Sequence, residues 1–276
     1  MLFVFHSVIM KKIIFFLFIS TSVFASKVDT LEVFSRSMQK PIKNIVILPD
    51  SYQNKNFPVL YLLHGASGDY TNWINNVPEL KTYADQYNMI IVCPDGDPFS
   101  WYFDSSINPK MKYETYIVKE LVTEVDKKYN TLTSTKGRAI TGLSMGGHGA
   151  FYLAFKHQDI FGAAGSMSGG MNLVKFPEYW EIDQLLGNQN EYPENWKNNT
   201  IMYMTDLVVG KDLKIIFDCG FDDFFYEVNK ELHQKMIEEN IPHEYTERPG
   251  KHDWNYWPNS LKYHMVFFDS FFNSKL

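Results

Sequence analysis

The sequence contains few cysteines and no excess of positive charge. Cys93 and Cys219 are its only cysteines, which excludes a disulfide-rich scaffold and a cysteine-based zinc module. Basic residues number 26 and acidic residues 32, so the net charge is −6 at pH 7. No large positive field is therefore available to bind a phosphate backbone, and we expect no nucleic-acid partner. The sequence also lacks His-Glu-x-x-His and calcium-loop motifs, so we expect no catalytic metal.

The chain does contain enough apolar material for a sizeable core. Hydrophobic residues make up 45% and aromatic residues 16% of the 276 positions, which excludes a disordered chain. A chain of this length suits one globular domain.

The N-terminal segment differs in character from the rest. Lys11 and Lys12 precede the apolar run 13–19, and Val23-Phe24-Ala25 ends in a small residue. This order of charged, apolar and small residues is typical of a secretory signal peptide. The apolar run is too short to span about 30 Å of hydrocarbon.

These features predict the domain organisation and location. We expect 1–25 to be a signal peptide, with Met10 as an alternative start because the residues before it place apolar side chains ahead of the charge. Residues 26–276 then form a single domain that is secreted or periplasmic and has no stable membrane span after cleavage.

Beyond residue 58, short apolar runs alternate with amphipathic stretches. The stretches 113–129 and 225–239 repeat apolar residues with helical spacing. The apolar runs resemble strands buried on both faces of a parallel sheet, and they lie at 59–63, 89–93, 138–141, 163–167 and 213–217. Two earlier β-rich segments, 28–33 and 42–48, predict a hairpin or edge pair. The fold class is α/β, with a mostly parallel central sheet and helices on both faces.

The segment 172–212 interrupts this alternation. It is rich in Asn, Glu, Trp and Tyr and shows no sustained period. Because it is long for a structureless loop, we expect short helices over one edge of the sheet. A lid-like insertion and a peripheral decoration are equally compatible with the pattern.

One segment matches the Gly-x-Ser-x-Gly pattern, namely Gly142-Leu143-Ser144-Met145-Gly146. An apolar strand precedes it and a helix rich in small residues follows, which is the order of a nucleophile elbow. We interpret Ser144 as a nucleophile, and the helix start behind it supplies N–H groups for an oxyanion.

A serine nucleophile needs a base, and His252 is placed best among the eight histidines. It follows the strand-like segment 243–247 and precedes a final helix, which fits the order Ser, acid, His. His243 and His264 are alternatives, but His243 falls at a strand and His264 within a helix.

The acid is expected after the strand 213–217, where three aspartates compete. Asp218 lies at the strand end, and Asp222 and Asp223 follow Gly220. Position alone leaves the last two open. The acid would hold the imidazole tautomer and stabilise the imidazolium.

The second part of an oxyanion hole is expected in the turn after strand 59–63. We assign the two donors to the backbone amides of Ala66 and Met145. His64, which opens the turn, is interpreted as a structural residue. Aromatic side chains beside these motifs could contact substrate, and we select Trp101, Tyr102 and Trp254.

The motifs together resemble the esterase D-like branch of the α/β-hydrolases, which includes carbohydrate esterase family one. The resemblance runs from about Pro58 to the C-terminus and rests on several motifs: His64-Gly65, Ser100-Trp101-Tyr102, the elbow, Cys219-Gly220-Phe221-Asp222-Asp223-Phe224 and Gly250-Lys251-His252-Asp253-Trp254. It implies an α/β-hydrolase fold with no required metal or organic cofactor, and Asp223 as the acid.

The resemblance implies an exported serine esterase that acts through an acyl-enzyme on acetyl or feruloyl esters of carbohydrates. An acyltransferase or an S-formylglutathione hydrolase-like thioesterase could use the same residues. Leu143 stands where the S-formylglutathione hydrolases usually have histidine. We expect Cys93 and Cys219 to be free and largely buried, because the expected strand order separates them.

Overall fold

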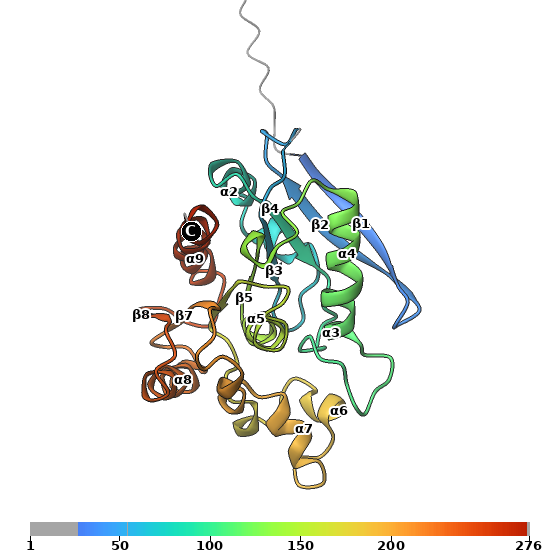
Figure 1. Cartoon of the computed structure of the whole chain (residues 1–276). Helices are drawn as coiled ribbons and strands as arrows, with labels where there is room; N and C mark the ends of the chain where they lie inside the picture. Colours follow the sequence, from blue (N-terminus) through green and yellow to red (C-terminus); the bar gives the residue numbers. More distant parts are fainter. Residues whose placement is uncertain (1–26, 54, 275–276) are drawn as a thin grey trace, which may run out of the picture.

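The computed structural model describes residues 27–53 and 55–274, so the expected signal peptide at 1–25 lies outside the described residues (Figure 1). Within this part of the chain, eight strands form one sheet in the order β1-β2-β4-β3-β5-β6-β7-β8. The strands are β1 Lys27–Ser35, β2 Lys40–Leu48, β3 Val59–Leu63, β4 Ile90–Pro94, β5 Arg138–Gly142, β6 Ala163–Met167, β7 Lys214–Gly220 and β8 Glu244–Arg248.

The sheet is parallel from β4 to β8 and antiparallel at the β1 edge. The expected N-terminal hairpin is β1 and β2, paired in register from Lys27 with Leu48 to Ser35 with Lys40. β2 pairs with β4 in antiparallel orientation, and every later pair is parallel. The mostly parallel α/β fold predicted from the apolar runs is confirmed.

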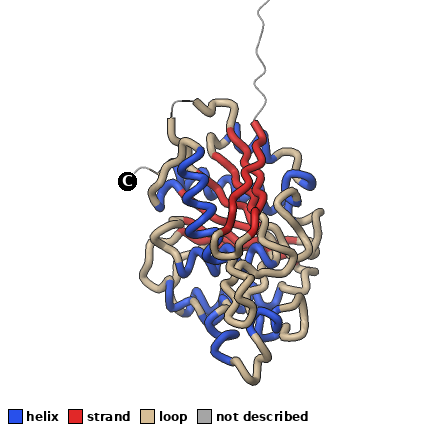
Figure 2. Tube along the Cα trace, turned by 90° about the vertical axis from the view of Figure 1, so that its right-hand side faces the viewer, coloured by secondary structure: helices blue, strands red, loops and turns tan. Residues whose placement is uncertain are grey.

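Helices cover both faces of this sheet (Figure 2). They are α1 Asn72–Asn76, α2 Leu80–Gln86, α3 Tyr113–Thr115, the π-helix η1 Tyr116–Leu121, α4 Val122–Lys128, α5 Met145–Lys156, α6 Ile182–Leu186, α7 Pro193–Asn198, α8 Tyr226–Glu238 and α9 Trp257–Asn273. The described residues also form four short 3-10 helices: η2 Thr135–Gly137, η3 Leu173–Lys175, η4 Ile201–Tyr203 and η5 Thr205–Leu207.

Alternation along β3 explains why the sheet is covered on both faces. Val59, Tyr61 and Leu63 belong to one apolar cluster, together with buried residues of η1, α4, α5 and α8. Leu60 and Leu62 belong to a second cluster with α1, α2 and α9. All five side chains are buried because successive residues of a strand point to opposite faces.

The single helix expected at 113–129 contains a π-helical turn. Tyr116, Ile117 and Val118 are consecutive and all buried, which a regular α-helix with one apolar stripe does not achieve. The wider π turn lets this stretch bury more than one stripe, and such turns occur as local insertions in α-helices.

The segment 172–212 holds η3, α6, α7, η4 and η5, which lie at the lower end of the molecule in Figure 1. Several of its apolar side chains are buried in the same cluster as the domain core, including Ile182, Leu185, Leu186, Trp196, Ile201, Met204 and Val208. Ser105 Oγ also donates to the Leu185 carbonyl at 2.7 Å. The segment is therefore packed onto the domain, and its action as a lid stays a prediction.

Both cysteines are free and buried, as predicted. Cys93 lies in β4 and Cys219 in β7, and three strands separate these in the sheet. Burial raises the pKa of both thiols. Among the described helices, none has the length and apolar character needed to cross a membrane.

Candidate active site

Ser144 stands at a strained turn between β5 and α5. Its backbone has φ 55° and ψ −119°, a region that non-glycine residues seldom occupy and that is typical of functional sites. Close packing on the end of β3 supports the turn, since a Cβ atom on Gly146 would lie 2.6 Å from the carbonyl oxygen of Leu63. The glycine in the elbow motif is thus required by the backbone behind it.

A continuous hydrogen-bond chain links Ser144, His252 and Asp223. His252 Nε2 lies 2.8 Å from Ser144 Oγ, and His252 Nδ1 lies 3.0 and 2.9 Å from the two carboxylate oxygens of Asp223. A carboxylate can only accept, so Nδ1–H donates to Asp223 and Nε2 is left to accept the serine proton. The arrangement can deprotonate the hydroxyl and return its proton to a leaving group.

Two loops at the carboxyl edge of the sheet bring His252 and Asp223 together. Asp223 follows β7 and His252 follows β8, and the loops are joined by backbone bonds from Phe221 N–H to Arg248 O (2.8 Å) and from Asp222 N–H to Gly250 O (2.9 Å). Asp223 is also fixed by the Phe225 N–H, which donates to its Oδ1 at 2.8 Å.

The competing residues lie elsewhere. Asp222 is exposed. His243 Nε2 pairs with His233 Nδ1 at 2.8 Å, and His264 Nε2 donates to the buried carboxylate of Asp218 at 2.9 Å. Of the candidates that the sequence left open, only His252 and Asp223 join Ser144.

The backbone amides of Ala66 and Met145, which the sequence predicts as oxyanion donors, are free to bind a ligand oxygen. In the part of the chain that the structure describes, neither the Ala66 nor the Met145 N–H has a hydrogen-bond acceptor. Met145 is the first residue of α5, where the helix leaves the N–H unused. Ala66 lines the same cavity as Ser144.

His64 is a structural residue of the turn that carries Ala66. Its Nδ1–H donates to the Gly65 carbonyl and its Nε2 accepts from the Gly96 N–H, both at 2.8 Å. Complete burial lowers the pKa of His64, so the ring is neutral and holds the turn with both nitrogens.

A cavity of about 410 Å³ opens beside Ser144 and His252. Four aromatic side chains line it, namely Trp180, Phe224, Trp254 and Trp257, along with polar groups of the loop after β3 and Asn72. Trp254 was predicted to contact substrate, and it does lie in this lining. Phe224 and Asn72 also line the cavity but were not selected from the sequence, because a single phenylalanine or asparagine carries no spacing signal.

The structure corrects the expectation for Trp101 and Tyr102, which do not line the cavity. Both are buried, with φ of 51° and 62°. The Tyr102 hydroxyl donates to the His64 carbonyl at 3.1 Å, and the Trp101 ring packs against His148. Both rings are packed in the domain core, and their hydrogen bonds reach the cavity-lining segments at Trp180 and after β3.

No cluster of metal-ligating side chains occurs in 27–53 and 55–274. The elements present are an α/β-hydrolase sheet, an elbow serine and an adjoining imidazole and carboxylate, and this combination defines the class of serine hydrolases with the α/β-hydrolase fold.

Comparisons with known proteins agree with this class. A family model described as "Putative esterase" matches residues 35–268. An acetyl esterase of Caldicellulosiruptor saccharolyticus is 26% identical over 249 residues, covering 82% of this chain and 92% of that protein. A solved ferulic acid esterase is 31% identical with a TM-score of 0.76, covering 91% of this chain and 100% of that structure.

A third relative has a different activity in its name. The diacylglycerol acyltransferase/mycolyltransferase Ag85A of Mycobacterium tuberculosis is 34% identical over 212 residues, covering 70% of this chain and 61% of that protein. The chain belongs to the esterase family of the matching model, and it is a serine hydrolase.

Proposed function

We propose that the protein is an exported serine esterase that hydrolyses carboxylic esters, with Ser144 as nucleophile, His252 as general base and acid, and Asp223 as the group that orients His252. The hydrogen-bond chain through these three side chains carries the proposal. Its distances match those of an activated nucleophile and its base.

The reaction runs in two halves. Ser144 Oγ attacks the acyl carbonyl while His252 Nε2 takes its proton, and the amides of Ala66 and Met145 bind the oxyanion. His252 then protonates the leaving alcohol, which departs as the acyl-enzyme forms. In the second half, water gives a proton to His252 and attacks the acyl-enzyme, and Ser144 recovers its proton when the acid is released.

Acetyl or feruloyl esters on carbohydrates are the substrate class we propose. The aromatic rings of Trp180, Phe224, Trp254 and Trp257 surround the cavity and can stack on a sugar or an aryl acid. Relatives named acetyl esterase and ferulic acid esterase support this class. The partner is then a small-molecule or oligosaccharide ester.

Replacing Ser144 tests the mechanism directly. Ser144→Ala should lower kcat on a short acyl nitrophenyl ester by roughly 10⁴-fold or more, because the attacking oxygen is removed while the cavity stays. Unchanged turnover in this variant would contradict the proposal. A screen of acetylated and feruloylated oligosaccharides then identifies the acyl group.

Export is part of the proposal and has its own test. N-terminal sequencing of protein recovered from the producing cells should find a mature chain that begins near Ser26. A chain that keeps residues 1–25 after fractionation would exclude cleavage of a signal peptide.

Acyl transfer is the alternative, and the 34% identity to Ag85A favours it over a thioesterase. A transferase would deliver the acyl group to an alcohol instead of water. Product analysis with a sugar alcohol as acceptor separates the two, since a hydrolase releases free acid at all acceptor concentrations.

A further inference from the structure

The buried carboxylate of Asp218 accepts hydrogen bonds from the segment that follows His252. Asp218 is in β7 and only 1% exposed. Its Oδ1 accepts the Tyr256 hydroxyl at 2.7 Å, and its Oδ2 accepts Ser260 Oγ at 2.6 Å and His264 Nε2 at 2.9 Å. These donors all follow His252 in the chain.

Asp218 is ionised in spite of its burial. Burial opposes the charged form, but the hydrogen bonds from His264 and Ser260 and the positive charge of Arg248, whose Nη1 lies 3.4 Å from Oδ1, lower its pKa below the ordinary value. Its hydrogen bonds are therefore charge-assisted, which makes them shorter and stronger than neutral ones.

Tyr256 connects Asp218 to the loop that carries His252. The Tyr256 ring covers Gly250, since a Cβ atom there would collide with the ring. Gly250 has φ 155°, and its carbonyl accepts the Asp222 N–H at 2.9 Å. The ring therefore packs against Gly250, where a backbone hydrogen bond joins the loop of His252 to the loop of Asp223.

The loop is bound to Asp218 at both ends. Arg248 closes β8 before the loop, and Tyr256 ends it just ahead of α9. Between these two residues His252 spans from Asp223 to Ser144.

We propose that Asp218 and Tyr256 are positioning residues for the esterase reaction, and that the Tyr256 hydroxyl bound to Asp218 fixes the loop 248–256 so that His252 contacts Ser144 and Asp223 together. The inference rests on the proposed function through the role given to His252. Neither residue lines the cavity, so both act through His252.

Ser260 provides a matched control. Its hydroxyl binds the same carboxylate but stands in α9, beyond the loop. Ser260→Ala therefore removes a comparable buried hydrogen bond while leaving the Tyr256 contact and the second donor to Oδ2, His264, in place.

The test compares Tyr256→Phe with Ser260→Ala. Tyr256→Phe keeps the ring on Gly250 and should lower kcat per active site about tenfold with KM changed less than about twofold, because a displaced base slows proton transfer more than it weakens binding. The rate at which a fluorophosphonate labels Ser144 should fall in parallel. Ser260→Ala should retain kcat and labelling rate within about twofold, even if its melting temperature falls.

Active-site titration with the fluorophosphonate counts folded sites, so misfolded protein does not affect kcat. Wild-type kcat in Tyr256→Phe, or an equal loss in Ser260→Ala, would overturn the inference. If Tyr256→Phe does not fold, Asp218→Asn takes its place, with the same tenfold loss expected. Labelling needs no ester substrate, so a wild-type protein that is labelled at Ser144 but turns over no ester rejects the proposed function while the positioning test proceeds.

Discussion

The indole N–H of Trp101 donates a hydrogen bond to the backbone carbonyl of Trp180 at 3.2 Å, and the two ring centroids lie 6.2 Å apart. Trp180 lines the cavity, whereas Trp101 is buried outside the lining. Trp180 and Glu181 both have positive φ, of 52° and 56°, a conformation that costs free energy unless neighbouring groups hold it. Trp101 is such a group, because it binds the carbonyl of the peptide that joins Trp180 to Glu181 and packs near the Trp180 ring.

Trp101→Phe should therefore weaken substrate binding without touching the substrate. It removes the hydrogen bond to Trp180 but keeps an aromatic ring, so we expect KM for a feruloyl ester to rise about threefold to tenfold. Nitrophenyl acetate is too small to depend on contact with Trp180, so its kcat should change less than about twofold. Steady-state kinetics on both esters measure the effect.

Trp196→Phe is the matched control. Trp196 is buried in α7 and donates to the Gly187 carbonyl at 2.8 Å, within the same segment but outside the cavity lining. Equal increases in KM for the two variants would show that Trp101 does not act through Trp180.

Two adjacent aspartates allow a sharp test of the acid. Asp223→Asn keeps the side-chain shape but presents an amide that favours the wrong tautomer of His252, so kcat should fall about 10³- to 10⁴-fold. Asp222→Asn changes an exposed neighbour and should leave kcat within about twofold. Kinetics on a nitrophenyl ester compare them, and a larger loss in Asp222→Asn would reverse the assignment.

These residues also show which parts of the site can be predicted from the sequence. Ser144 could be predicted because the elbow is local, since strand, glycine spacing and helix are contiguous. The choice between Asp222 and Asp223 needed more than position, because it depends on a turn fixed by a backbone bond to Arg248 at the end of β8. That bond connects residues distant in the chain, and side-chain types do not reveal it.

The aromatic residues show what could not be predicted from the sequence. Trp101 and Trp254 both flank motifs, yet only Trp254 lines the cavity. Trp101 has a positive φ and packs against His148 in the core, and tryptophan carries no sequence signal for that conformation. Core packing and substrate contact demand the same residue types, so composition cannot separate them.

The two thiols should not react with thiol reagents in the folded protein. Cys93 and Cys219 are buried and burial raises the pKa of each, so the reactive thiolate is scarce. Ellman's reagent should detect fewer than about 0.1 thiols per native chain and about two after unfolding in guanidinium. Rapid reaction of the native protein would indicate that β4 or β7 opens.

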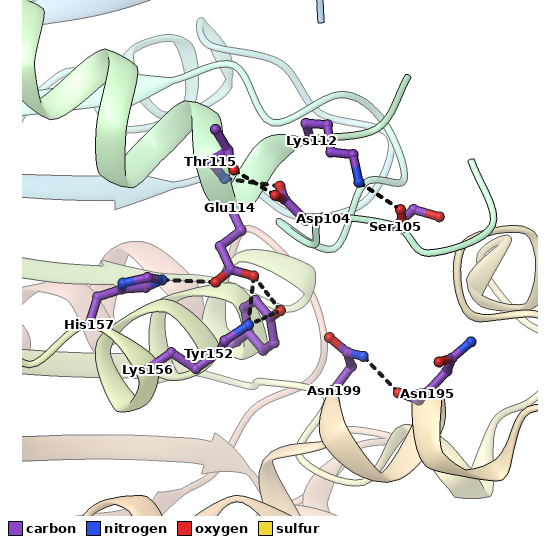
Figure 3. Close-up of polar contacts among 10 residues, drawn as sticks. All are labelled: Asp104, Ser105, Lys112, Glu114, Thr115, Tyr152, Lys156, His157, Asn195 and Asn199. Atoms are coloured by element: carbon purple, nitrogen blue, oxygen red, sulfur yellow. Dashed lines mark hydrogen bonds and ion pairs between the residues drawn. The ribbon is translucent and has the colours of Figure 1, made fainter. Parts of the chain in front are cut away.

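A polar cluster between α3 and α5 should make stability depend on pH (Figure 3). The Glu114 carboxylate accepts the Tyr152 hydroxyl at 2.6 Å, Lys156 Nζ at 2.7 Å and His157 Nε2 at 2.9 Å. Burial favours the neutral acid, but these three donors outweigh it and lower the pKa of Glu114 to about 2. The cluster therefore holds the start of α3 against the end of α5.

Because the folded pKa lies below the usual value of 4.5, the stabilisation is complete above that pH and is lost as the pH falls from 4.5 towards 2. Glu114→Gln should lower the free energy of unfolding by about 2 kcal/mol at pH 7, and the gap to wild type should shrink through this window. Urea unfolding at several pH values measures this gap.

Glu124 gives the control. It pairs with Lys127 at 3.5 Å and its side chain is 42% exposed, so Glu124→Gln should lower the free energy of unfolding by less than about 0.5 kcal/mol. A gap for Glu114→Gln that stays constant from pH 7 to 3 would mean that the carboxylate is not held by its donors in the folded protein.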